Sequence, residues 1–482
     1  SLHFPFLILL SCTPALSKPN VLFLGIDDLN DWIGCLGGHP QVKTPNLDRL
    51  AARGTLFTNA HCQAPVCNPS RTSVMLGLRP STTGIYSLQP SFKKVPKYAN
   101  QVTIPKAFKL NGYTTSTLGK IYHAALPKGE FDRAGVRPPL PNRFPDEKLV
   151  NTPKNHKLVD WGIWPPKDSD QLDYKTADWV VNEFSQMPKD PFFMAVGFFR
   201  PHVPLYASQE WFDLYPEDSL VLPLIRRDDR EDTPLFSWYL HWELPEPRLK
   251  FLDETKQLKN KVRSYLASVS FVDSQVGRVL DTLEQSGLQK NTIVVCWSDH
   301  GYHLGEKEIT GKNTLWDPTT RVPLIFAGPG ISKGARCGSP AELLDIYPTL
   351  AELCGLKSVP EEIEGLSLVP QLQDAQAPRF RPAITSHGPG NDSARSETHR
   401  YIRYADGSEE LYDIRKDPHE FNNLASDPKT GKLRNKLASY FPMAPAKPVV
   451  GSNARLIERK KDGSVYWQNT LIEKNAKIPK YE

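Results

Sequence analysis

Two apolar runs of this chain end in acids: Asn20-Val21-Leu22-Phe23-Leu24-Gly25-Ile26-Asp27-Asp28 and Thr292-Ile293-Val294-Val295-Cys296-Trp297-Ser298-Asp299. Continuous apolar runs of this length are typical of strands that are buried on both faces of a parallel sheet. The carboxyl ends of parallel strands meet at one edge of the sheet, where open α/β proteins bind their ligands. We therefore expect the acids of both runs to lie together at such an edge.

Strand and helix patterns alternate through most of the chain, which predicts a sheet sandwiched between helices. The charged stretch 226–257, rich in Trp and Pro, is typical of an inserted loop region. The predicted strands are residues 21–26, 114–118, 192–196, 292–297 and 322–326, and the predicted helices are residues 46–53, 70–76, 175–186, 259–285 and 341–353.

The pattern changes near the carboxyl end of the chain. Residues 399–404 and 409–413 flank the turn Ala405-Asp406-Gly407-Ser408, which predicts a β-hairpin. We therefore expect a main domain over residues 18–375 and a small antiparallel subdomain over residues 376–482.

Composition narrows the class of protein. The chain has 482 residues, a formal net charge of +5 and seven cysteines, and its length exceeds the range in which a single core keeps growing. No basic run or RNA-binding signature is present, so the mild positive charge favours anionic substrates over nucleic acid. The cysteines show neither zinc-site spacing nor a disulfide framework, although Cys35 could pair with Cys62. No pattern indicates the oligomeric state.

The first residues resemble a targeting signal. Residues 3–10 are an apolar stretch too short to span a bilayer, and Ala15-Leu16-Ser17 resembles a signal-peptide cleavage site. We interpret residues 1–17 as the remnant of a signal peptide and expect export to the periplasm or the extracellular space. Leu9-Leu10-Ser11-Cys12 also fits a lipid-attachment box, and in that alternative Cys12 would anchor the protein to a membrane.

A third motif, Cys67-Asn68-Pro69-Ser70-Arg71, opens a helical pattern that continues to Leu76. The first turn of a helix exposes backbone N–H groups that favour anions, and the side chain of residue 67 would lie beside them. Taken alone, a single cysteine is more often a small buried hydrophobic residue, and an Asp pair after a strand is often a helix cap. The three motifs together favour a functional site.

These motifs resemble those of the formylglycine-dependent sulfatases of the alkaline phosphatase superfamily, in particular the iduronate-2-sulfatase-like branch. The resemblance covers nearly the whole chain after residue 18. It implies an alkaline-phosphatase-like α/β fold, with a large mixed sheet between helices, residues 18–375 as the catalytic domain and a small C-terminal antiparallel-sheet subdomain. Further matching segments are Gly119-Lys120-Ile121-Tyr122-His123, Arg200-Pro201-His202-Val203-Pro204, Asp299-His300-Gly301 and Val322-Pro323-Leu324-Ile325-Phe326.

The resemblance implies a metal site and a modified cysteine. A formylglycine-generating enzyme would oxidise Cys67 to formylglycine, whose aldehyde hydrate would be the nucleophile and whose second hydroxyl would let sulfate leave by elimination. Three carboxylates suit Ca²⁺, with Mg²⁺ as the alternative, whereas a histidine is a less usual neighbour of calcium. The cation would be surrounded by Asp27, Asp28, Asp299 and His300, and residue 67 would complete its shell.

The same resemblance gives roles to the other polar residues of the motifs. Arg71 would hold the hydrate of residue 67, and Lys120 and Lys312 would bind sulfate oxygens. His123 would remove the proton that triggers elimination, and His202 would act with Lys312 on the leaving alcohol. Histidine suits proton transfer because its unperturbed pKa is about 6.5.

Three functions are compatible with these residues. The first is hydrolysis of sulfate esters on a sulfated saccharide, either an oligosaccharide derived from a polysaccharide or a glycan that contains uronic acid. The second is hydrolysis of phosphonate or phosphate esters. Lys312 and His202 favour sulfate esters over these substrates. The third is a non-catalytic glycan-binding relative with an unconverted Cys67, which would not need the complete set of ligands and proton-transfer groups. The sequence does not identify the sugar or the sulfated position.

Two positions depart from the family pattern. Leu76-Gly77-Leu78, followed by Arg79, stands where the family usually has Thr-Gly-Arg, in the segment that the maturation enzyme reads. Lys307 stands where many relatives have histidine. We expect Cys67 to be converted nonetheless, and we expect Lys307 to alter contacts with the substrate.

Overall fold

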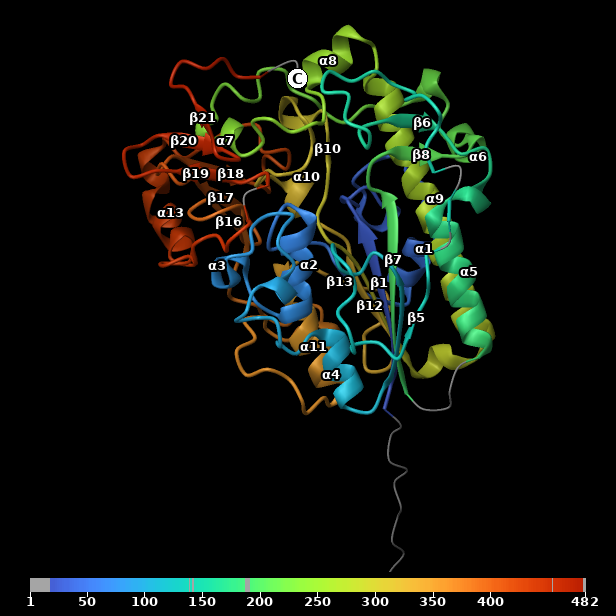
Figure 1. Cartoon of the computed structure of the whole chain (residues 1–482). Helices are drawn as coiled ribbons and strands as arrows, with labels where there is room; N and C mark the ends of the chain where they lie inside the picture. The colour runs from blue at the N-terminus through green and yellow to red at the C-terminus, as the bar shows by residue number, and fades with distance from the viewer. Residues whose placement is uncertain (1–17, 138, 141–142, 187–190, 453, 480–482) are drawn as a thin grey trace, which may run out of the picture.

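The computed structural model describes residues 18–479 apart from 138, 141–142, 187–190 and 453, and is built on an eight-stranded mixed sheet (Figure 1). The strand order is β13-β2-β12-β9-β1-β7-β4-β5. β12 runs antiparallel to its neighbours β9 and β2, whereas β9, β1, β7, β4 and β5 are parallel. The strands are β1 Asn20–Asp27, β2 Gly54–Phe57, β4 Thr114–Gly119, β5 Arg133–Ala134, β7 Phe192–Pro201, β9 Thr292–Ser298, β12 Leu324–Ala327 and β13 Ala335–Cys337.

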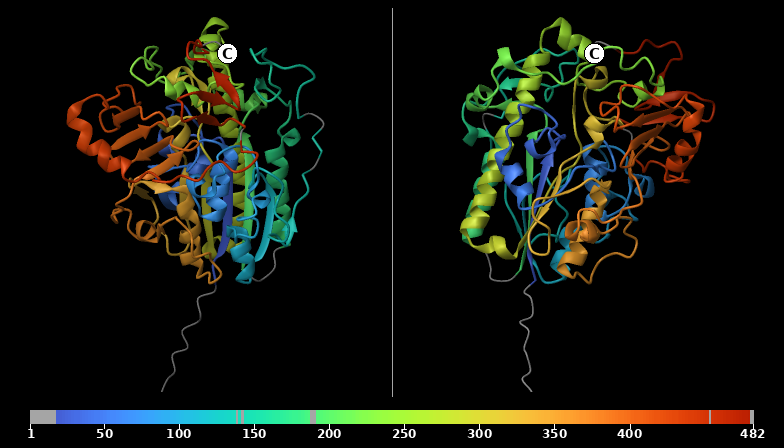
Figure 2. Two further views of the ribbon diagram at one scale, coloured as in Figure 1. Left: turned by 60° about the vertical axis from the view of Figure 1, so that its left-hand side comes forward. Right: turned by 180° about the vertical axis from the view of Figure 1, so that it is seen from behind.

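Helices cover both faces of this sheet, and β1 is therefore buried along its whole length. Leu22 and Leu24 pack into one core with α1, α5 and α9, whereas Val21 and Phe23 pack into a second core with α2, α4 and α11. Successive residues of a strand point to opposite faces, so a strand covered on both sides has to be apolar throughout. Figure 2 shows the two helical layers. The helices are α1 Pro45–Ala52, α2 Cys67–Leu76, α4 Ile104–Leu110, α5 Leu172–Ser185, α9 Leu258–Gln285 and α11 Ile346–Cys354.

The predicted strands and helices are confirmed with two differences: the strand predicted over 322–326 begins only at Leu324, and the helix predicted over 341–353 is wrong at its start. Ala341–Glu342 form strand β14, which pairs with β3 (Ala60–His61), and α11 begins only at Ile346. The carboxylates of Glu342 and Asp345 accept backbone N–H groups from each other's residues in a capping box, which fixes an irregular turn before the helix.

The predicted C-terminal hairpin is confirmed as β17 (His399–Arg403) and β18 (Glu409–Asp413), which pair antiparallel. It belongs to a four-stranded antiparallel sheet in the order β15-β16-β17-β18, and a three-stranded sheet follows. The boundary at residue 376 stays a prediction. The remaining elements here are β15 Ala383–Ser386, β16 Asp392–Arg395, α13 Gly431–Ala438, β19 Ile457–Arg459, β20 Val465–Trp467 and β21 Thr470–Ile472.

Residues 226–257 form an irregular segment with two short helices, α7 (Phe236–Tyr239) and α8 (Leu249–Glu254). Trp238 from this segment shares a core with Trp316, from the loops after β9, and with Trp467, from the last sheet. This core holds the C-terminal sheets beside the carboxyl end of the central sheet (Figure 2). Other short elements are α3 Pro80–Thr83, β6 Trp161–Ile163, β8 Leu205–Ala207, α6 Gln209–Asp213, β10 His303–Leu304, β11 Thr310–Gly311, α10 Asp317–Thr320 and α12 Val369–Gln373.

Within the described part of the chain, no helix is both long enough and apolar enough to cross a membrane. The predicted signal-peptide remnant 1–17, including the proposed lipid-attachment residue Cys12, lies outside the described residues. Cys35 and Cys62 do not pair, since each is a free thiol.

A buried arginine ties the C-terminal sheet to the main domain. The Arg400 side chain has no exposed surface, and its guanidinium donates to the Leu315 carbonyl at 2.9 Å. It also forms ion pairs with Asp317, the first residue of α10, and with Glu420.

We predict that Arg400→Ala destabilises the protein strongly, because it leaves the buried carboxylate of Glu420 without its cation and leaves Asp317 with Arg395 alone, at 3.6 Å. Breaking one side of a buried pair typically costs about 3–5 kcal/mol. Arg434→Ala is the matched control, since its pair with Glu409 is partly exposed and such pairs contribute about 0–1 kcal/mol. Thermal unfolding should show a large fall in the midpoint for the first variant alone. Similar midpoints for both variants would contradict the prediction.

Candidate active site

Seven of the ten predicted site residues follow four strands that are adjacent and parallel in the central sheet, whereas Cys67 and Arg71 lie in α2 and Lys312 follows β11. Because the carboxyl ends of such strands lie side by side, residues far apart in sequence meet there. In Figure 1 this edge lies at the upper end of β1 and β7. The residues are Asp27 and Asp28 at the end of β1, Asp299 and His300 after β9, His202 after β7, and Lys120 and His123 after β4.

Cys67 is the first residue of α2 and is buried at this edge. Its Sγ lies 3.2 Å from Lys312 Nζ, 3.3 Å from His300 Nε2 and 3.7 Å from Lys120 Nζ. The Asp28 carboxylate oxygen Oδ1 lies 4.0 Å from the sulfur. The sulfur marks the place where the oxygens of a formylglycine side chain would stand.

The surroundings of Cys67 favour negative charge. Burial by itself raises the pKa of the thiol, but Lys120, Lys312 and His300 outweigh burial and hold the pKa well below its ordinary value. His123 also contributes to this lowering. The two lysines would also favour an anionic group beside residue 67.

Arg71, one turn further along α2, faces the carboxylates. Its Nε donates to Asp299 Oδ2 at 2.8 Å and one terminal nitrogen donates to Asp27 Oδ1 at 3.0 Å. Its other terminal nitrogen donates to the backbone carbonyls of Lys120 and Ile121. Arg71 thus fixes two carboxylates relative to each other, and its predicted contact with the hydrate of residue 67 stays a prediction.

The acids and His300 fit a divalent cation. Ligand atoms of Asp27, Cys67, Asp299 and His300 lie within 4.8 Å of one another, as do those of Asp27, Asp28, Cys67 and His202. His300 Nδ1 lies 3.0 Å from the Gly301 carbonyl, so this nitrogen carries a proton and Nε2 can present a lone pair to a metal.

Three cationic side chains compensate the three carboxylates of the site. Asp27, Asp28 and Asp299 have no exposed surface. Lys120 forms an ion pair with Asp27, and Lys312 lies 2.7 Å from Asp28. Carboxylates gathered this closely attract hard cations that prefer oxygen ligands, such as Ca²⁺ and Mg²⁺.

The backbone at Asp28 is held in an uncommon conformation, with φ of 61°. Its N–H donates to Asp299 Oδ1 at 3.1 Å, and its carbonyl accepts the Tyr265 hydroxyl at 2.8 Å. Tyr265 in turn accepts the Asn30 N–H at 3.0 Å. The sequence does not single out Tyr265, because in α9 it is one of many buried residues of an amphipathic pattern.

Two serines also orient the site. Ser298 Oγ accepts the Leu29 N–H and donates to the His300 carbonyl, both at 3.0 Å. Ser70 Oγ donates to the Asp299 carbonyl at 2.5 Å. Both serines stand inside the motifs described above, and their position in these motifs is the one sequence feature that could have predicted their role.

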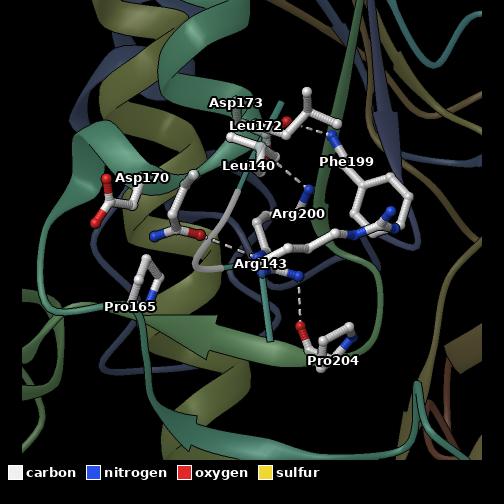
Figure 3. A pocket seen from close by; sticks show the side chains of 10 residues that line it. Leu140, Arg143, Pro165, Asp170, Leu172, Asp173, Phe199, Arg200 and Pro204 are labelled. Atoms are coloured by element: carbon white, nitrogen blue, oxygen red, sulfur yellow. Dashed lines mark hydrogen bonds between the residues drawn. The ribbon is translucent and has the colours of Figure 1, made fainter. Parts of the chain in front are cut away.

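Hydrogen bonds from residues around the pocket shown in Figure 3 hold the loop that carries His202. The two carboxylate oxygens of Asp173 accept the backbone N–H groups of Phe199 and Arg200, each at 2.7 Å. Arg200 donates to the Pro204 carbonyl at 2.5 Å. His202 Nδ1 lies 2.7 Å from the Val203 carbonyl, which leaves Nε2 as its free nitrogen.

Lys307 does not take part in the site. Its ammonium group is buried, lies 2.7 Å from Asp229 Oδ1 and also donates to the Glu420 carbonyl. The expectation that Lys307 alters substrate contacts is therefore wrong, because the side chain is used in a buried ion pair with another part of the chain.

Comparison with known proteins decides the family. The family described as "Sulfatase" matches residues 19–356, and the family described as "N-sulphoglucosamine sulphohydrolase, C-terminal" matches residues 305–444. The chain belongs to the sulfatase family. It is 42% identical over 468 residues to a sulfatase of Formosa agariphila, and this alignment covers 93% of this chain and 92% of the relative. It is 32% identical over 399 residues to the iduronate 2-sulfatase of Homo sapiens, over 71% of this chain and 70% of that protein.

Solved structures agree with this assignment. A structure of a 2-O GAG sulfatase aligns with a TM-score of 0.68 and 26% identity, over 88% of this chain and 91% of the other. A phosphonate monoester hydrolase from Silicibacter pomeroyi aligns with a TM-score of 0.72 over 94% and 99%, but its 20% identity shows the fold alone. This sulfatase is thus a sulfuric ester hydrolase with the predicted alkaline-phosphatase-like fold.

We predict that Tyr265→Phe destabilises the protein by about 1–3 kcal/mol, because the buried Asp28 carbonyl and Asn30 N–H lose their partner. Tyr302→Phe is the matched control. Its ring stacks on that of Tyr265 at 5.7 Å, but its buried hydroxyl has no hydrogen-bond partner among the described residues. Urea denaturation should separate the two variants. If Tyr302→Phe costs as much as Tyr265→Phe, the hydroxyl of Tyr265 does not hold the backbone as described.

Proposed function

We propose that this sulfatase hydrolyses sulfate esters on a saccharide that contains uronic acid, with formylglycine derived from Cys67 and a bound Ca²⁺. The observation that carries the proposal is the setting of Cys67. Lys312, Lys120 and His300 all lie within 3.7 Å of its sulfur, and the carboxylates of Asp27, Asp28 and Asp299 lie beside them. This arrangement supports both an anionic substrate group and a cation.

Asp27, Asp28, Asp299 and His300 would hold the cation, and residue 67 would complete its shell. When bound, Ca²⁺ or Mg²⁺ supplies positive charge that polarises a sulfate oxygen. With the carboxylates neutralised in this way, Lys120 and Lys312 no longer have to compensate Asp27 and Asp28. Their ammonium groups are then available to bind sulfate oxygens.

Residue 67 requires maturation, for which we propose a formylglycine-generating enzyme as partner. Formylglycine supplies a hydrated aldehyde, whose two hydroxyls allow attack on sulfur and later release of sulfate. His123, beside residue 67, would take the proton of the second hydroxyl. His202 would pass a proton from Nε2 to the leaving alcohol, together with Lys312, which suits a group with an unperturbed pKa of about 6.5.

The saccharide is suggested by the relatives. The human relative is an iduronate 2-sulfatase by name, and the matching structure is of a 2-O GAG sulfatase. The phosphonate alternative rests on a shared fold alone, and Lys312 beside residue 67 favours sulfate. The non-catalytic alternative is disfavoured because a protein that only binds glycans would not need metal-ligand candidates, cationic side chains and proton-transfer candidates together at one edge of the sheet.

We predict sulfate release from 2-O-sulfated uronic-acid oligosaccharides by protein co-expressed with a formylglycine-generating enzyme. Cys67→Ala should abolish the release, because no other described residue would carry the attacking oxygen. Cys354→Ala is the matched control, since that buried thiol stands at the last residue of α11, outside the site, and it should retain activity. Faster hydrolysis of a matched phosphonate monoester than of every sulfated saccharide would contradict the proposal.

We predict that chelation removes activity and that Ca²⁺ restores it. A ligand at 100 times its dissociation constant stabilises the native state by about 2.7 kcal/mol, so Ca²⁺ should also raise the melting temperature. Asp28→Asn should weaken this stabilisation, whereas Glu361→Gln, which changes an exposed acid, should not. If Ca²⁺ raised the melting temperature of Asp28→Asn as much as that of the wild-type protein, Asp28 would be excluded as a ligand.

A further inference from the structure

An aromatic ring lies between two of the side chains to which the proposed function gives roles. Phe199, near the carboxyl end of β7, is half-buried and lines the pocket shown in Figure 3. Its ring centroid lies 4.8 Å from that of the His202 imidazole and 5.4 Å from Lys120 Nζ. The ring thus contacts one side chain that follows β7 and one that follows β4.

The backbone around Phe199 is held by hydrogen bonds that do not involve its ring. The Phe199 N–H donates to Asp173 Oδ1 at 2.7 Å, and the Phe199 carbonyl accepts the His202 N–H at 3.0 Å. The second bond closes a turn of four residues, which fixes where His202 leaves the strand. On the neighbouring strand, the Lys120 N–H donates to the Gly197 carbonyl at 2.9 Å. The paired backbones therefore place the ring beside both side chains.

An aromatic face suits the ammonium group of Lys120 better than a further acid would. A lysine carries its charge on a flexible four-carbon stem, so it needs partners to stay in one place. The Lys120 ammonium already forms an ion pair with Asp27 and lies 3.7 Å from Cys67 Sγ. A second carboxylate would repel an incoming sulfate, whereas an aromatic face attracts a cation through its quadrupole and carries no net charge.

The same ring restricts the imidazole of His202. The two ring planes are tilted by 52°, and this contact adds to the hydrogen bond between His202 Nδ1 and the Val203 carbonyl at 2.7 Å. A single hydrogen bond leaves an imidazole free to swing about its own side-chain torsions, and a packed ring removes part of that freedom. Placement matters here because an error of about 1 Å in a reacting group can cost on the order of 100-fold in rate.

We propose that Phe199 is a positioning residue, whose ring holds the Lys120 ammonium group and the His202 imidazole in place relative to each other. The inference rests on the proposed function, in which Lys120 binds a sulfate oxygen and His202 protonates the leaving alcohol of the same ester. Phe199 acts through these two side chains and supplies no group to the reaction.

Kinetics of the matured, calcium-loaded enzyme on a 2-O-sulfated uronic-acid oligosaccharide test this role. Phe199→Leu stays apolar but loses the ring face, so kcat should fall about tenfold or more, with a smaller change in KM. Phe199→Tyr keeps the ring and should retain kcat within about twofold. Phe421→Leu is the matched control and should change neither constant. The Phe421 ring also stacks on a histidine, His419, at 5.4 Å and has the Arg226 guanidinium carbon at 5.5 Å, but it lies outside the site. An unchanged kcat in Phe199→Leu, or an equal loss in Phe199→Tyr, would overturn the inference.

Thermal unfolding separates this inference from the proposed function, because it needs no substrate. Phe199→Leu is introduced into the unmodified protein, into Lys120→Met and into His202→Gln. If the ring holds both side chains, Phe199→Leu should lower the melting temperature less in each of the two variants than in the unmodified protein. An equal fall in either variant would show that the ring does not hold that side chain and would overturn the inference. If the unmodified enzyme releases no sulfate, the proposed function fails, and these unfolding measurements alone decide whether the ring holds both groups.

Discussion

Three buried carboxylates at one edge of the central sheet require positive charge, and much of the surrounding structure supplies it. Asp27, Asp28 and Asp299 have no exposed surface. An unpaired charge in such a place would cost several kcal/mol. Arg71 bridges Asp27 and Asp299, whereas Lys120 and Lys312 pair with Asp27 and Asp28. The guanidinium of Arg71 is fully used by carboxylates and backbone carbonyls. Under the proposed function, the two lysines would exchange a carboxylate for a substrate anion when a divalent cation is bound.

The sheet makes this concentration of charge possible. β4, β7, β1 and β9 are consecutive and parallel, so each contributes side chains from its carboxyl end to the same place. Helix α2 begins at this edge and presents Cys67 from its first turn, where backbone N–H groups favour anions. Tyr265 and the serines fix the backbone between these groups. The C-terminal sheets enclose the same edge through the core around Trp316 and through Arg400.

Much of this arrangement could be predicted from the sequence, because the strands carry strong signals. An apolar run such as 21–26 has few alternatives to a strand covered on both faces, and the acids after it mark the edge. The residues matched to the family motifs indeed lie together around Cys67. Supporting contacts were harder to predict: Tyr265 is one tyrosine among the buried residues of a long helix, and Lys307 looked like a substitution in a motif but serves a buried ion pair. Such roles depend on which side chain happens to lie opposite, and a single sequence does not contain that information.

The central claim is that residue 67 attacks sulfur and needs two hydroxyls on one carbon to release sulfate. Cys67→Ser provides one hydroxyl in the same position, so it can attack but has no route of elimination. Intact-protein mass spectrometry of the calcium-loaded variant, incubated with a 2-O-sulfated uronic-acid oligosaccharide that the unmodified enzyme hydrolyses, tests this directly. The account predicts one sulfate covalently bound, located on Ser at position 67 by peptide mapping. A variant that turns over without accumulating the adduct, or that carries the sulfate on another residue, would contradict it.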